Sequence, residues 1–283
     1  MSEPFSTAYD HHLVQRARRL RLGNRFRSGS QLLGGYRSRI KGNGLEYVES
    51  RAYMPGDDVR RMDWTVTART AHPYVKLFEE EKQLRILQLV DVGASMFFGG
   101  RQRTKLQTAL SAAVALAYAA MRDQDVSQLL LFGGEQAQLF SPVRRAGEFS
   151  HMCHQLDAFN LSPYQQPVRR KTALEAMVQT VAAMKHRPSV VLLYSDLSPI
   201  EQFEALGPRL ASIADLLIIQ TLSRLEIDPK PMRRVRLYSP DSRRAASSAK
   251  AVPTVSSLWG RRVHSLTDDG DIIADLQRVL GRR

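Results

Sequence analysis

The sequence predicts an α/β protein in which a doubly wound, mostly parallel sheet follows an N-terminal helical and β extension. From residue 84 onward, short apolar runs alternate with segments of helical periodicity, the pattern of a parallel sheet covered by helices on both faces. Residues 190–193 and 216–219 are apolar at every position, as strands buried on both faces must be. The 283 residues are 43% hydrophobic, which suffices for one substantial core and a small appended lobe.

The N-terminal region predicts a basic helix. Apolar residues recur on one face and arginines lie between them. We expect this helix to end at Gly23 and Asn24, and the Ser- and Gly-rich residues 28–45 to form a loop. We also expect residues 1–80, which include the β extension, to pack on a sheet domain formed by residues 81–283. The apolar face of the helix consists of Leu13, Val14, Ala17, Leu20 and Leu22.

The remaining elements follow in order along the sheet domain. Their types rest on hydrophobic periodicity, and Thr172 stands where the N-cap of the third helix is expected. Residues 240–256 are rich in Ser, Ala, Arg and Pro and predict a mobile loop. The predicted strands are 84–90, 127–132, 189–195 and 214–221, and the predicted helices are 104–122, 147–158, 173–185, 200–211 and 270–280.

The charge balance favours acidic partners. The chain carries 41 Lys and Arg against 28 Asp and Glu, a formal net charge of +13, and the excess is concentrated in residues 1–41 and 224–262. No helix-turn-helix, zinc finger or aromatic-interleaved basic strand accompanies these flanks, so a nucleic-acid-binding scaffold rests on charge alone. No apolar run reaches the roughly 20 residues that cross a bilayer, and we expect a cytoplasmic protein.

Oxygen ligands follow two of the predicted strands. Asp91 ends the first strand with Ser95 four residues beyond it, and Asp196 follows the third. Thr172, at the start of the helix between those strands, directs a hydroxyl toward the same edge. Because ligands of open parallel sheets bind at the carboxyl ends of the strands, these groups predict a magnesium site that retains several waters.

This pattern resembles the metal-dependent adhesion site of von Willebrand factor A domains, D-x-S-x-S followed by a threonine and a later aspartate. Matched by residue, Asp91 is the first aspartate, Ser95 the second serine, Thr172 the threonine and Asp196 the last aspartate. Gly93 replaces the first serine and removes one hydroxyl ligand. The resemblance implies Mg²⁺ completed by a carboxylate of a protein partner. Without metal, the two aspartates would cap loops and helix starts.

A second resemblance is carried by residues 53–64, YMPGDDVRRMDW, with the segments ART, YVK and FEEE that follow up to residue 81. This stretch is similar to the signature of the bacterial "domain of unknown function 58" family, and the match extends over residues 42–96. The family resemblance implies a von Willebrand factor A-like domain after the signature. It also implies a partner, a MoxR-type AAA ATPase, for which the chain would serve as an adaptor in the assembly or activation of other proteins.

The signature also has physical content of its own. Asp57 or Asp58 is placed to cap a short helical turn that begins at Val59. Asp63 is placed to pair with Arg60 or Arg69, and Trp64 to anchor the segment on the sheet domain. One interpretation is a structural latch held by ion pairs. The other is an exposed docking patch for a partner, formed by Arg60, Arg61 and Arg69.

The function that the sequence favours is non-enzymatic protein binding. A sheet edge with oxygen ligands and a basic surface suits the capture of an acidic group on another protein. A metal-dependent phosphodiester hydrolase is the enzyme alternative, since Asp57, Asp58, Asp63, Asp91 and Asp196 supply carboxylates. No lysine or histidine base stands at a diagnostic spacing from them.

Overall fold

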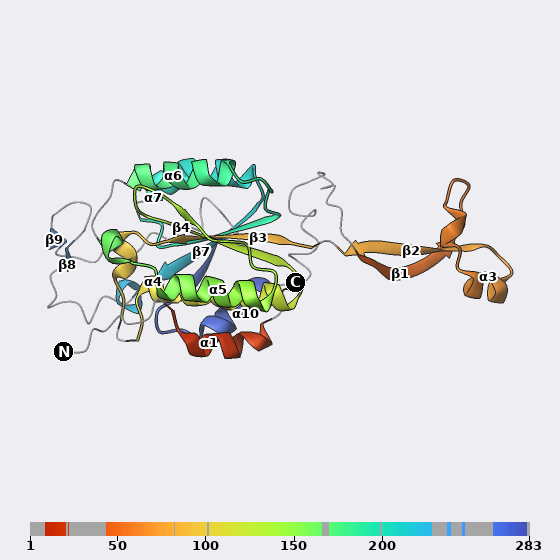
Figure 1. The fold of residues 1–283 in the computed structure, drawn as a ribbon, viewed down its shortest axis with the longest axis horizontal. Coiled ribbons are helices and arrows are strands. Elements are labelled where there is room, and N and C mark those ends of the chain that lie inside the picture. Colours follow the sequence, from red (N-terminus) through yellow and green to blue (C-terminus); the bar gives the residue numbers. More distant parts are fainter. Residues whose placement is uncertain are drawn as a thin grey trace. The chain divides into compact units, whose positions relative to one another are not determined.

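A computed structural model describes residues 9–20, 22, 44–81, 83–100, 102–165, 170–198, 200–227, 237–238, 245–246 and 263–281 (Figure 1). Contacts divide the chain into two compact units. The sheet unit comprises Met1–Gly34 and Leu84–Arg283, and the hairpin unit comprises Gly35–Gln83. Each unit is described by itself.

The described residues of the sheet unit form a six-stranded sheet in the order β10-β7-β6-β3-β4-β5. Every neighbouring pair is parallel except β4 and β5, which are antiparallel. The doubly wound fold class is therefore confirmed, and the four predicted strands are present. The strands are β3 (Arg85–Asp91), β4 (Val126–Phe132), β5 (Gln138–Leu139), β6 (Val190–Ser195), β7 (Asp215–Leu222) and β10 (Val263–Thr267).

Helices α4 (Lys105–Arg122), α5 (Ala146–Asp157) and α10 (Ile272–Gly281) cover one face of this sheet (Figure 1). Nearly every residue of α4 is buried, and its many alanines allow close approach to the strands. Thr104 caps α4 by accepting a hydrogen bond from the Gln107 amide, while the Gln107 side chain accepts one from the Thr104 amide. This cap fixes the position of Lys105, the first residue of the helix.

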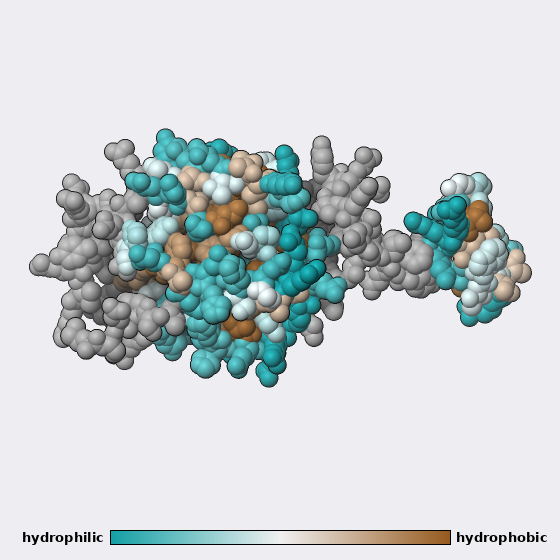
Figure 2. Space-filling view, in the orientation of Figure 1, coloured by the Kyte–Doolittle hydropathy of each residue, from teal (hydrophilic) through white to brown (hydrophobic). Residues whose placement is uncertain are grey.

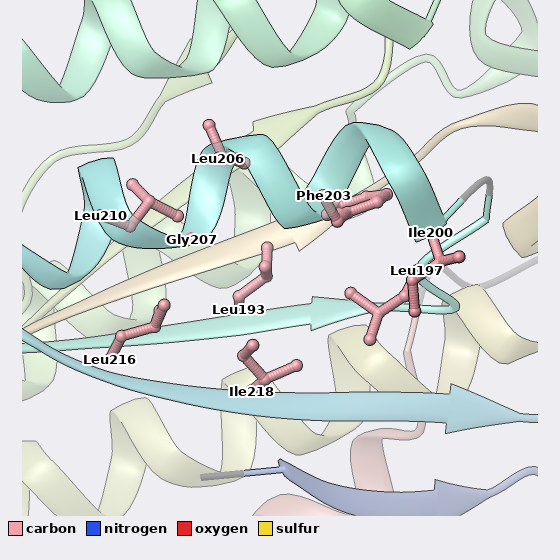
Figure 3. Close-up of a pocket in the computed structure, with 9 residues that line it drawn as sticks. All are labelled: Leu193, Leu197, Ile200, Phe203, Leu206, Gly207, Leu210, Leu216 and Ile218. Carbon is pink, nitrogen blue, oxygen red and sulfur yellow. The ribbon is translucent and has the colours of Figure 1, made fainter. Parts of the chain in front are cut away.

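Helices α6 (Arg170–Ala182) and α7 (Ile200–Ala211) cover the opposite face. Apolar side chains of α7, among them Phe203 and Leu206, line a small cavity together with Leu193 of β6 and Ile218 of β7 (Figure 3). The cavity between them measures about 10 Å³, which is room for a single water, so this layer is packed core. Helix α6 begins before residue 173, and Thr172 therefore lies in its first turn.

The N-terminal segment packs on α4. Helix α1 (His11–Arg16) continues into η1 (Ala17–Arg19), so the helix is shorter than predicted. Arg122 donates hydrogen bonds to the carbonyl oxygens of Arg18 at 2.8 Å and Leu20 at 2.6 Å. The burial of Leu13 and Leu20 ties these residues to the sheet unit, so the division between the two units does not coincide with the predicted boundary at residue 80.

In the hairpin unit, β1 (Gly44–Ala52) pairs antiparallel with β2 (Tyr74–Glu81). The turn η2 (Val59–Arg61) and helix α3 (Trp64–Thr70) connect the two strands. Asp58 caps η2 by accepting a hydrogen bond from the Arg60 amide at 3.0 Å, as predicted.

Short elements complete the described chain: η3 (Ala94–Phe97), η4 (Ser162–Gln165), α8 (Arg224–Ile227), β8 (Leu237–Tyr238) and β9 (Ala245–Ala246). The predicted loop at 28–45 lies outside the described residues apart from the start of β1, and the one at 240–256 apart from β9. Within the described residues, no helix is both long and apolar enough to cross a membrane.

Candidate functional site

Asp91 ends β3 and is fully buried. Its Oδ1 accepts a hydrogen bond from the Gly93 amide at 2.9 Å, and its Oδ2 accepts one from the Ser195 hydroxyl at 2.6 Å. Ser195 ends β6, which pairs with β3 in parallel, so the carboxyl ends of the two strands are adjacent. The predicted strand-end group thus contains Asp91 with a serine from the neighbouring strand.

The glycine after β4 brings a third connection to this edge. Gly133 has φ +146°, and a Cβ there would lie 2.4 Å from the Gly93 nitrogen. The backbones after β3 and β4 therefore pack directly against each other, which fixes the loop that starts at Val92.

Asp196 follows β6 and is also buried, with 6% of its surface exposed. Its Oδ1 accepts a hydrogen bond from the Ser198 amide at 3.1 Å. Its Oδ2 lies 2.9 Å from the Nζ of Lys105, whose side chain is 2% exposed. A lysine that no prediction included therefore supplies a cation at the strand ends.

Lys105 binds a second carboxylate, that of Glu226 in α8. The Lys105 Nζ lies 2.7 Å from Glu226 Oε1 and 5.7 Å from the centroid of the Phe98 ring. Burial opposes protonation of Lys105, but the Asp196 and Glu226 carboxylates outweigh it and raise the pKa of the ammonium above its usual value. Lys105 is therefore a buried, charged group between two acids.

Asp268 holds α8 in place beside this lysine. Its carboxylate accepts hydrogen bonds from the Gly100 amide at 2.6 Å, the Ser223 hydroxyl at 2.7 Å and the Arg224 amide at 2.9 Å. The Ser223 amide in turn donates to Glu226 Oε2 at 2.9 Å. The position of the Glu226 carboxylate is thus set by the connections after β7 and β10.

The two predicted hydroxyl ligands have different surroundings. Ser95 lies half-buried in η3, directly after the β3 connection. Thr172 is exposed in the first turn of α6, because the helix begins at Arg170 and the predicted N-cap position is wrong. The strand-end convergence is therefore seen for the two aspartates, and Ser195 takes part in it.

The described side chains do not fit the magnesium ion that the resemblance implies. Both oxygens of Asp91 accept hydrogen bonds, and an ammonium lies 2.9 Å from Asp196. A fixed positive charge beside this carboxylate repels a divalent cation, and magnesium requires near-octahedral geometry. Among the described residues, no group of three or more His, Cys, Asp or Glu side chains is arranged to hold a metal. Magnesium binding thus stays a prediction from the sequence alone, whereas the described contacts favour Lys105 as the cation of this site.

Sequence reasoning missed Lys105, Ser195 and Glu226, although Lys105 left a signal. It is the first residue of a largely buried, alanine-rich helix, where a positive charge opposes the helix macrodipole. Such a lysine requires a compensating anion. The sequence does not name that anion, because Asp196 and Glu226 lie 91 and 121 residues away.

The three signature arginines, Arg60, Arg61 and Arg69, are exposed in the hairpin unit. The predicted pairing of Asp63 with Arg60 or Arg69 is wrong. Asp63 instead caps α3 through the Thr65 and Val66 amides, both at 3.1 Å, and accepts a hydrogen bond from the Ser50 hydroxyl at 2.6 Å. The arginines are thereby left on the surface.

Exposed hydrophobic side chains accompany these arginines. Met54, Val59 and Trp64 are 61%, 57% and 66% exposed. Figure 2 shows hydrophobic and hydrophilic side chains next to each other on the described surface of this unit. Whether Trp64 anchors the hairpin unit on the sheet domain stays a prediction.

Comparisons with known proteins identify relatives of the chain. Residues 49–244 match a family described as "Protein of unknown function DUF58". "Uncharacterized protein Rv1480" from Mycobacterium tuberculosis is 28% identical, over 97% of this chain and 90% of that protein. The "conserved hypothetical protein BatB" from Bacteroides thetaiotaomicron has a TM-score of 0.42 and 8% identity, covering 70% of this chain and 97% of that one. The "SpRpn10 VWA domain" has a TM-score of 0.40 and 14% identity, covering 69% and 93%.

Proposed function

The chain belongs to the DUF58 family of proteins of unknown function. We propose that it is a non-enzymatic protein-binding module with a von Willebrand factor A-like fold. Its strand-end site would bind an acidic group of a partner protein. The observation that carries this proposal is the buried Lys105 ammonium, held 2.9 Å from Asp196 and 2.7 Å from Glu226 at the carboxyl ends of the strands.

The arrangement suits recognition. A rigid parallel sheet positions the loops at its carboxyl edge, where partners of doubly wound folds commonly bind. A lysine in a site of low dielectric attracts a carboxylate more strongly than a lysine in water does. The net charge of +13 favours the approach of acidic surfaces over longer distances.

The partner that we propose is a MoxR-type AAA ATPase. This choice rests on the family resemblance of the signature in residues 53–64. The exposed Arg60, Arg61 and Arg69 supply a second contact surface, because guanidinium groups bind carboxylates in a bidentate manner. The chain would then act as an adaptor between the motor and its substrates.

Hydrolysis of phosphodiesters has less support from the contacts. Asp57 pairs with Arg51 at 2.7 Å, and Asp63 caps α3, so both carboxylates have structural partners within the hairpin unit. Nucleic-acid binding rests on the basic segments 1–41 and 224–262, which fall largely outside the described residues. Neither alternative is favoured by a specific contact.

Capture of a purified MoxR-type AAA ATPase from the same genome tests the proposal. The immobilised wild-type chain should retain the ATPase, and the Arg60→Ala, Arg61→Ala double variant should retain at least about tenfold less, given the strength of charged hot spots. Arg209→Ala, which removes an exposed arginine of α7, is the control and should bind like wild type. If the wild-type chain does not capture the ATPase, the proposed partner is contradicted. If the double variant captures it equally well, the proposed arginine patch is contradicted.

A further inference from the structure

We propose that Glu226 is an internal ligand of Lys105, and that an acidic side chain of the partner replaces it when the partner binds. This inference rests on the proposed function and specifies which chemical group its site binds. The site would take a carboxylate, and the protein would hold the site closed until that carboxylate arrives.

The geometry distinguishes Glu226 from the other carboxylate at Lys105. The Asp196 side chain is 4% exposed, whereas the Glu226 side chain is 23% exposed. Asp196 directly follows the central strand β6, and Glu226 lies in the four-residue helix α8 after β7. Glu226 is therefore the carboxylate on the solvent side of the lysine, and a partner would reach it first.

The charges make replacement more favourable than addition. Asp196 and Glu226 together carry two negative charges against the single positive charge of Lys105. A third carboxylate at the ammonium would leave two excess negative charges in a largely buried site, and such like-charge contacts are unfavourable. A carboxylate that replaces Glu226 leaves the charge of the site unchanged.

The hydrogen bonds of the connection after β7 allow the Glu226 side chain to move away from Lys105 while the rest of the connection stays in place. The Ser223 amide donates a hydrogen bond to Glu226. The Arg224 amide and the Ser223 hydroxyl both donate to Asp268. Movement of Glu226 breaks its bonds to Lys105 and to the Ser223 amide, while the bonds to Asp268 remain. Because Glu226 is partly exposed, its carboxylate can be hydrated once released.

Binding of a fluorescently labelled hexaglutamate peptide, followed by anisotropy in the full chain, tests this inference. Glu226→Gln removes the competing charge and should tighten binding about tenfold, the lower end of coupling between close charge pairs. Glu135→Gln is the matched control, because it removes one negative charge from an exposed residue in the loop after β4. That control should stay within about twofold of wild type, since exposed charges contribute little.

Two further variants make the outcome specific. Adding Lys105→Met to Glu226→Gln should abolish the gain, because the receiving cation is then absent. Glu226→Asp keeps the charge but shortens the side chain, so its gain in peptide affinity should be smaller than that of Glu226→Gln. It replaces Glu226→Gln in the test if that variant proves unstable. The inference is overturned if Glu226→Gln binds the peptide no better than Glu135→Gln, or if the gain survives the loss of Lys105.

These results are separable from the proposed partner. Failure of ATPase capture together with a tightened peptide interaction in Glu226→Gln would contradict the partner and support the internal ligand. Successful capture together with no effect of Glu226→Gln would support the partner and contradict the internal ligand.

Discussion

Lys105 is the residue on which the site depends. Its ammonium is almost entirely withdrawn from water, and two carboxylates compensate for the lost hydration. Replacing a whole buried ion pair by apolar groups is often tolerated, but removing one partner leaves the others buried and uncompensated. The lysine is therefore both a structural requirement and the source of the site's positive charge.

Lys105→Met should lower the free energy of unfolding by about 3–5 kcal/mol, because Asp196 would lose its buried counterion. Urea unfolding followed by circular dichroism measures the change. The control is Lys171→Met, which removes an exposed lysine that pairs with Glu175 at 4.0 Å and should cost less than about 0.5 kcal/mol. Similar losses in the two variants would show that the Lys105 pair contributes little.

The same ion pairs predict a pH dependence at the alkaline end. Because the folded-state pKa of Lys105 is raised, its contribution to stability is complete below the ordinary lysine pKa of about 10.4. The contribution is lost as the pH rises through the folded-state pKa. The difference in unfolding free energy between wild type and Lys105→Met should therefore be constant from about pH 7 to 9 and shrink above about 10.4. A difference that shrinks between pH 7 and 9 would contradict the raised pKa.

At the residue scale, the sequence predicts the two aspartates of the site but not its lysine and glutamate. Asp91 and Asp196 are recognisable because each follows an apolar strand, and parallel strands end at one edge. Lys105 and Glu226 reach that edge from a helix start and a short connection, and nothing in the local sequence encodes their meeting. The polar contacts of the site are long-range and depend on how the connections fold.

At the scale of single elements, side-chain caps determine where the short helices of the signature segment begin. Asp63 is buried, and its hydrogen bonds to the Ser50 hydroxyl and the Val66 amide lower the pKa of its carboxyl. The cap sets the start of α3, and Arg69 is exposed in the last turn of the same helix. Asp63 therefore stabilises the signature through hydrogen bonds and not through the predicted ion pair, and the docking patch of Arg60, Arg61 and Arg69 stays a prediction.

Asp63→Ala should destabilise the start of α3 by about 0.5–2 kcal/mol, the usual effect of losing an N-cap. Hydrogen exchange of amides in residues 64–71 measures the change and should accelerate by about twofold to thirtyfold. Asp58→Ala, which removes the cap of η2, is the control and should leave exchange in α3 unchanged. Unchanged α3 exchange in Asp63→Ala would contradict the capping role.

Elements with strong periodicity are predictable, and those fixed by tertiary contacts are not. The strands β3, β4, β6 and β7 are apolar runs that the sequence shows directly. By contrast, β5 has two residues, and β10 has the sequence VHSLT with only one buried position. Both edge strands are defined by pairing with a neighbour, which a single sequence does not reveal.

At the scale of the whole molecule, the N-terminal segment belongs to the sheet unit. Leu13 and Leu20 are buried in the core cluster that α4 shares with the sheet. This basic helix is part of the core, because its apolar face is covered by α4. Truncations that remove this segment would expose α4.

Leu13→Ala should lower the free energy of unfolding of the sheet unit by about 2–5 kcal/mol through the loss of buried contacts. Urea unfolding, monitored by hydrogen exchange of the amides in α4, measures this change in the free energy of unfolding. His12→Ala, at an exposed position of the same helix, should change stability by less than about 0.5 kcal/mol. A Leu13→Ala variant as stable as His12→Ala would contradict the assignment of this segment to the core.

A magnesium titration of the wild-type chain by calorimetry tests the central claim, that the Lys105 ammonium is the cation of the strand-end site. The expected result is no saturable heat, because the ammonium lies 2.9 Å from Asp196 and opposes a divalent ion. Saturable one-site binding that Asp91→Asn abolishes would contradict the claim and establish the metal site that the sequence predicted.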